Sequence, residues 1–141
     1  MATQIHPLYG FGTTLPLSFD EAIARVTEAL LAEGFGVLTS IDVKATMKNK
    51  LNVDFEQYTI LGACNPELSH RALTLEPQVG LFLPCNVVIR ETPVAGEQPQ
   101  TRIEIADPIA MLGMVQEPEM QDLATEAKAR LQRVITEIAS A

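Results

Sequence analysis

The hydrophobic and polar positions of this chain change their period several times, and each change marks an expected element. Residues 8–15 alternate between two sets of side chains, which is typical of a half-buried β-strand, and include two glycines where another segment can pack closely. Residues 19–33 instead repeat apolar side chains at helical spacing opposite a charged side. We therefore expect a loose N-terminal segment over residues 1–7, then a strand, then a helix.

Local signals at both ends of this helix predict its length. Ser18 and Glu21 form a capping box, in which each side chain accepts a hydrogen bond from a backbone amide of the first turn. Gly34 can take the left-handed C′ conformation without Cβ strain. The helix should therefore end at Gly34, and residues 35–43 should return as a second strand.

The middle of the chain predicts a short helix, a strand and a second capped helix. Residues 44–51 carry three lysines among good helix formers, and residues 56–63 are rich in β-branched and aromatic side chains, as in a third strand. Asn65 is a favoured N-cap and Pro66 is favoured at the first helical position. A helix is therefore expected from this pair to about residue 76.

Residues 79–89 are the most apolar stretch of the chain. Because this run is too continuous for a strand with one wet face, it predicts a central strand buried on both sides. Pro84 should interrupt that strand, since proline cannot donate to a ladder. The polar residues 93–99 predict a hairpin loop that returns through a strand over residues 101–106.

The C-terminal part is predicted to be helical. Residues 109–115 form a compact apolar segment, whose Met111 and Met114 could line a pocket, form a subunit contact or fill the core. From Pro118 to Ile138 the apolar residues follow a regular helical stripe. Strands outnumber long helices and one hairpin is present, so a single α+β domain over residues 1–141, with a mainly antiparallel sheet, is favoured over a doubly wound fold.

Composition and charge narrow the possible partners. Ten Lys and Arg against eighteen Asp and Glu give a net charge of −8, which repels a phosphate backbone, so no nucleic-acid partner is expected. No stretch reaches the roughly twenty apolar residues that span a bilayer, and residues 1–7 lack the features of a signal peptide. We therefore expect a cytoplasmic protein with no membrane partner.

The two cysteines are the first candidates for chemistry. A structural disulfide is not expected in a cytosolic chain. Cys64 directly precedes an expected helix N-terminus, where the helix dipole favours the thiolate, and His70 lies about one turn inside that helix. The alternative is that Cys64 and Cys85 are both simply buried, because free cysteine often serves as a small hydrophobe.

The remaining candidates for a site are weaker. Cys64, Cys85 and His70 lack the short Cys-x-x-Cys spacing of structural zinc sites, and His6 falls in the loose N-terminal segment, so no metal or other cofactor is expected. Lys50 belongs to the only basic cluster, which also contains Lys44, Lys48 and the nearby Asp42. This cluster could supply a general base or hold an anion, or it could be a solvated helical turn. Nucleotide-loop and common hydrolase motifs are absent.

Three segments resemble the signature of the domain of unknown function 302 family: residues 58–66, 79–88 and 107–111, of which the first two each contain a Cys-Asn pair. The resemblance runs from Tyr9 to the final helix. It implies a small α+β domain of the TATA-binding-protein-like class, with helices packed on an antiparallel sheet, and often a homodimer; it brings no established activity. The matching positions are Gly34, Phe35, Asp42, Lys50, Gly62, Cys64, Asn65, Pro66, Gly80, Pro84, Cys85 and Asn86.

Our first hypothesis is a homodimer that binds a small ligand or a protein partner. The long apolar stripe that ends at Ile138, together with residues 109–115, offers more apolar surface than one small sheet obviously covers, which favours a dimer. We further expect the two Cys-Asn motifs to meet at one edge of the sheet and their thiols to share a pocket. The site would then consist of Cys64, Asn65, Cys85 and Asn86.

Two other hypotheses stay open, so whether this chain is an enzyme is undecided. In the first, the protein is a thiol-dependent redox enzyme or sensor, with Cys64 as the thiolate and Cys85 as the resolving thiol, while His70 or Lys50 adjusts the local charge. In the second, the protein has a structural or interaction role and both thiols are buried.

Overall fold

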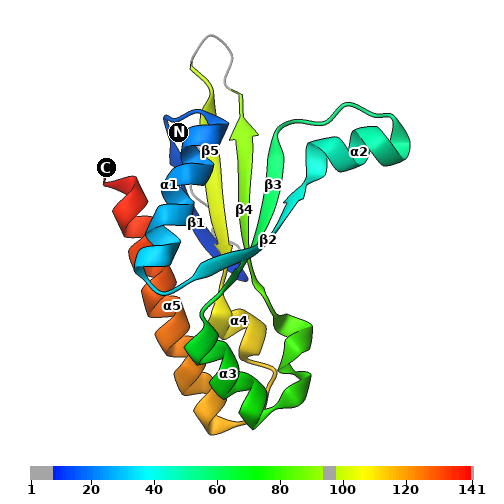
Figure 1. Ribbon diagram of the computed structural model, residues 1–141. Helices are drawn as coiled ribbons and strands as arrows, with labels where there is room; N and C mark the ends of the chain where they lie inside the picture. The colour runs from blue at the N-terminus through cyan, green and yellow to red at the C-terminus, as the bar shows by residue number, and fades with distance from the viewer. Residues whose placement is uncertain (1–7, 94–97, 141) are drawn as a thin grey trace.

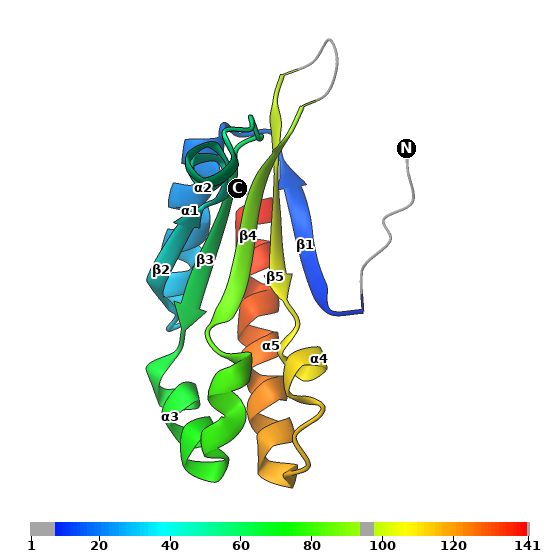
Figure 2. The same ribbon diagram turned by 90° about the vertical axis from the view of Figure 1, so that its right-hand side faces the viewer.

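The computed structural model describes residues 8–93 and 98–140, and it contains a five-stranded sheet with helices on one face (Figures 1 and 2). Every neighbouring pair of strands is antiparallel, and the order across the sheet is β1-β5-β4-β3-β2. The expected α+β fold with an antiparallel sheet is confirmed. The strands are β1 Gly10–Leu15, β2 Gly36–Asp42, β3 Tyr58–Cys64, β4 Cys85–Thr92 and β5 Gln100–Ala106.

The helices lie in two groups. Two long helices cover one face of the sheet, and three short helical segments gather beyond one end of it, alongside the first half of the longest helix (Figure 2). A further helix, α2, projects from the opposite end of β2 and β3 (Figure 1) and has no buried residue. The helices are α1 Phe19–Ala32, α2 Val43–Leu51, α3 Pro66–Leu75, the 3₁₀ helix η1 Pro77–Phe82, α4 Pro108–Leu112 and α5 Pro118–Ala139.

The two signals that bound α1 act as expected. The backbone N–H of Glu21 donates to Oγ of Ser18 at 3.2 Å, which completes the capping box. At the other end Gly34 has a φ of +86°, and its N–H donates to the carbonyl of Leu31 at 3.0 Å. The N–H of Phe35 donates to the carbonyl of Leu30 at 2.9 Å, so the helix ends in a Schellman motif and the chain turns directly into β2.

The face of the sheet beneath α1 and α5 forms the larger of two cores. Its central side chains are fully or almost fully buried and come from alternate positions of three strands, as the pleat requires: Leu61, Val87, Ile89, Ile103 and Ile105. On the opposite face Ile60 pairs with Val88, and Glu104 accepts from Nε of Arg90 at 3.3 Å. This second face is therefore mixed in character and only half buried.

Strand β1 approaches β5 very closely. A Cβ built on Gly12 would collide with the backbone carbonyl of Ile103, so only glycine fits this position. The expectation that a glycine near the start of the chain allows close packing is confirmed at this residue.

A smaller core lies beyond the end of the sheet, where α3, η1, α4 and the first half of α5 meet. Val79, Leu112, Met120 and Leu123 are buried there. The apolar stripe of α5 is thus buried in the two cores of its own chain. Met120, Leu131 and Ile138 are fully buried there. The apolar surface from which a dimer was expected is therefore not on this helix.

The expected strand over residues 79–89 is only half correct. Its first part is the 3₁₀ helix η1, and strand β4 starts at Cys85, directly after Pro84. Pro77 opens the 3₁₀ helix, and the carboxylate of Glu76 caps it by accepting from the N–H of Gln78 at 3.1 Å. Strand β4 is the central strand of the sheet, but Val88 is only half buried, so the strand is not enclosed on both faces.

Residues 94–97 of the expected hairpin loop, and residues 1–7 with His6, lie outside the described residues. Within the described ranges no helix combines the length and the apolar character that a membrane crossing requires.

Candidate functional site

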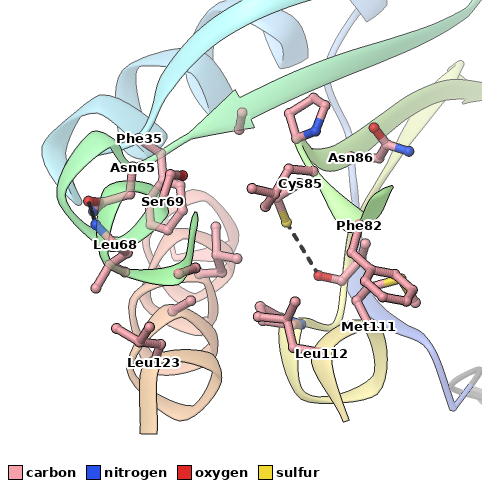
Figure 3. Close-up of a pocket in the computed structure, with 18 of the residues that line it drawn as sticks. Phe35, Asn65, Leu68, Ser69, Phe82, Cys85, Asn86, Met111, Leu112 and Leu123 are labelled. Carbon is pink, nitrogen blue, oxygen red and sulfur yellow. Dashed lines mark hydrogen bonds between the residues drawn. The ribbon is translucent and has the colours of Figure 1, made fainter. Parts of the chain in front are cut away.

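A cavity of about 240 Å³ lies where the sheet meets the helices beyond its end (Figure 3). It is enclosed by the end of β3, the start of β4, the end of β5 and all the helical segments of the smaller core. Leu81 and Asn86, which contribute to its lining, are exposed, so the cavity opens to solvent near them.

One wall is built by the start of α3. The N-cap residue Asn65 is 5% exposed, and its Oδ1 accepts from the backbone N–H of Leu68 at 3.2 Å. This bond fixes the direction of the first turn and presents Leu68, Ser69 and Ala72 to the cavity (Figure 3). The side-chain oxygen of Asn65 is therefore already occupied by the helix cap.

The opposite wall depends on how β5 ends. Asp107 caps the short helix α4 through its Oδ1, which accepts from the N–H of Ile109 at 2.9 Å, while its Oδ2 pairs with Nζ of Lys128 at 2.7 Å. These contacts join α4 to α5 and hold Met111 and Leu112 against the cavity.

Cys85 lies between the two walls and contributes a sulfur to the cavity (Figure 3). Its thiol donates a long hydrogen bond to the carbonyl of Ala106, with 3.6 Å between sulfur and oxygen. Burial, and secondarily the negative charge of Asp107, raise the pKa of the Cys85 thiol to about 12. A thiol with a pKa in this range is almost entirely protonated near pH 7, which disfavours Cys85 as a nucleophile.

Cys64 does not line this cavity. Strands β3 and β4 are neighbours, as expected, but the cross-strand partner of Cys85 is Ala63. Cys64 is the last residue of β3 and follows the last pair that this strand makes with β4. Its sulfur lies 3.1 Å from Oγ of Ser69. The structure therefore places Cys85, and not Cys64, in the lining of this cavity.

The other candidate residues are spread over the molecule. Asn86 lines the mouth of the cavity, whereas His70 lies on α3, is exposed and is not part of the lining. Lys50 belongs to α2, beyond the opposite end of β2 and β3 (Figure 1). Among the residues that the structure describes, no group of three or more His, Cys, Asp or Glu side chains could hold a metal ion.

Several residues of the cavity were missed by the sequence reasoning. Leu123, Ala127 and Leu131 of α5 line it, as do Phe35 and Phe82. In the sequence each of them has the pattern of an ordinary core residue, because an apolar stripe is the same whether the helix packs against other side chains or lines a cavity. A small side chain in the stripe is no clear signal of open space either, since Ala127 lines the cavity whereas Ala124 is fully buried in the smaller core.

Comparisons with known proteins agree on one family. The model of the family described as "Domain of unknown function DUF302" matches residues 11–138. The chain is similar to the crystal structure of an uncharacterised conserved DUF302 protein from Bacillus stearothermophilus, with 30% identity and a TM-score of 0.81, over 92% of this chain and 98% of that one. No match was found among curated proteins.

Proposed function

The chain belongs to the DUF302 family. From that premise we propose that it is a binding module, and that it binds a small organic molecule in the cavity at the end of its sheet. The observation that carries the proposal is the cavity itself. The cavity is a concave space of about 240 Å³ that opens to solvent and is lined mostly by apolar side chains. An apolar cavity with a few polar groups at its wall is the usual form of a small-molecule site.

The state of the thiols favours binding over thiol chemistry. The lining contains one thiol, that of Cys85, whose raised pKa keeps it protonated near pH 7, and Cys64 does not belong to the lining. His70 and Lys50, the groups that could have adjusted the charge of a thiolate, do not line the cavity. The polar groups that do so are Asn65, Ser69, Cys85 and Asn86.

A cavity-filling variant tests the proposal. Ala127→Leu adds three carbons to the wall contributed by α5, and it should abolish binding without loss of stability, since the added group enters empty space. Ala129→Leu is the matched control, because Ala129 is an exposed residue of the same helix and does not line the cavity. The measurement is ligand-observed NMR with a set of small organic fragments, with thermal melting to verify the fold of each variant.

We expect fragments that bind the wild type and Ala129→Leu but not Ala127→Leu. If Ala127→Leu melts early, Ala72→Val, which narrows the α3 wall, replaces it. The proposal fails if no fragment binds the wild type, or if a folded cavity-filling variant binds the same fragments as tightly.

A further inference from the structure

We infer that the ligand of this cavity is an uncharged aromatic molecule of about one ring, an inference that rests on the proposed function and narrows it. Three properties of the cavity lead to this class of ligand: the absence of charge in its lining, its volume, and the kinds of groups that face its interior.

The lining is electrically neutral. Of the described residues that line the cavity, none is Asp, Glu, Lys, Arg or His. The nearby carboxylate of Asp107 is already satisfied by Lys128 at 2.7 Å and by the N–H of Ile109 at 2.9 Å. A buried ion without a partner is strongly disfavoured, so a charged ligand would lose its hydration without compensation.

The volume sets the size of the ligand. An apolar protein cavity of about 150 Å³ is enough to hold benzene. The cavity here measures about 240 Å³, which leaves room for one ring with a short substituent. A substituent of this kind can reach the mouth, where Asn86 is exposed.

The groups on the walls favour an aromatic ring over an aliphatic one. The sulfur-containing residues Cys85 and Met111 belong to the lining, as do the aromatic residues Phe35 and Phe82 (Figure 3). Sulfur atoms make favourable contacts with aromatic rings, and aromatic pairs gain from edge-to-face packing beyond their buried area. A saturated ring of the same size would receive neither contribution.

Four probes of nearly equal size separate these properties: toluene, methylcyclohexane, benzoate and benzylamine. Their affinities for the full-length protein are measured by NMR titration near pH 7, where benzoate is an anion and benzylamine is a cation. We expect toluene to bind best, with methylcyclohexane a few-fold weaker and both ions at least about tenfold weaker. Either ion binding as tightly as toluene, or methylcyclohexane binding more tightly than toluene, overturns the inference. The proposed function survives that outcome, because it is tested separately, by whether fragments bind the wild type and lose their affinity for a folded cavity-filling variant.

A charge placed on the wall provides a second test. Met111→Lys introduces an ammonium group at a half-buried lining position, and it should reverse the order of toluene and benzoate. Met114→Lys is the matched control, because Met114 is 75% exposed and lies outside the lining, so its probe preferences should match those of the wild type. If a folded Met111→Lys variant keeps the wild-type order, the neutrality of the wall does not select the ligand and the inference is wrong.

Discussion

The side-chain amide of Asn65 lies directly against Gly34, so the end of α1 and the start of α3 meet at these two residues. A Cβ built on Gly34 would be 2.9 Å from Nδ2 of Asn65, closer than real Cβ contacts come. Gly34 therefore serves two purposes, since its φ of +86° terminates α1 and its missing side chain makes room for the cap of α3.

Gly34→Ala should lower the free energy of unfolding by about 1 kcal/mol or more, because it introduces both left-handed strain and the contact with Asn65. Chemical denaturation measures this change. Gly36→Ala is the control: a Cβ at Gly36 would meet nothing within 4 Å, so little change is expected there. Equal midpoints for Gly34→Ala and the wild type would show that the helix end tolerates a side chain.

Cys85 should resist alkylation in the folded protein. Its side chain is half buried, and its raised pKa leaves almost no thiolate near pH 7. In the Cys64→Ser variant, in which Cys85 is the sole cysteine, iodoacetamide should label the protein only after denaturant is added, as followed by mass spectrometry. Rapid labelling of the native variant at pH 7 would contradict this assignment and revive the redox hypothesis.

Stability should fall as the solution becomes alkaline. The pKa of Cys85 is about 12 in the folded protein and about 9 when unperturbed, so between these values the unfolded chain loses a proton that the folded chain keeps. The contribution of the protonated Cys85 thiol to the free energy of unfolding is thus fully present below pH 9. It is lost as the pH rises toward 12, by up to about 1.4 kcal/mol per pH unit.

The Cys85→Val variant isolates this effect, because it keeps an apolar group of similar size in the wall but cannot ionise. Its melting temperature should depend less on pH than that of the wild type between pH 8 and 10.5. Parallel curves for the two proteins over this range would show that the thiol does not titrate differently on folding.

We propose that the protein forms a homodimer, and the structure changes the surface on which we expect it. Large exposed apolar side chains concentrate between residues 38 and 55, on the edge strand β2, where Leu38 is 67% exposed, and on and after the projecting helix α2, where Leu51 is 66% exposed. Exposed apolar patches often mark interfaces. Light scattering at micromolar concentration should give about twice the 15.4 kDa of one chain.

The variant Leu51→Lys should shift this assembly toward the monomer, whereas Leu73→Lys, at a 41% exposed position on α3, should not. A wild-type mass equal to that of one chain would rule out the dimer under these conditions. If Leu73→Lys dissociated the dimer and Leu51→Lys did not, the dimer contact would lie at the α3 end of the molecule instead of the α2 end.

The sequence predicted well those features that depend on neighbouring residues. The capping box at Ser18, the turn at Gly34 and the N-cap at Asn65 are each determined within a few positions, and the structure has all three. The hydrophobic run over residues 79–89 suggested one strand, but its first part belongs to a 3₁₀ helix that begins at Pro77 and ends before Pro84.

The candidate site was harder to predict because it depends on register. A shift of one residue in the pairing of β3 with β4 would have placed Cys64 opposite Cys85, and no local pattern distinguishes the two arrangements. The cavity also combines residues from Phe35 to Leu131, most of them ordinary apolar side chains. Only the packing of four helical segments shows that they surround open space.

The pairing of β1 with β5 has a consequence for how the chain acquires its structure during synthesis. Gly10 pairs with Ala106 and Leu15 with Thr101, so the first strand to be made must wait for the last one. Closing such a long loop is slow compared with forming the adjacent hairpin of β4 and β5. Until β1 docks against β5, the edge of β5 presents unpaired backbone groups that can pair with a strand of another chain.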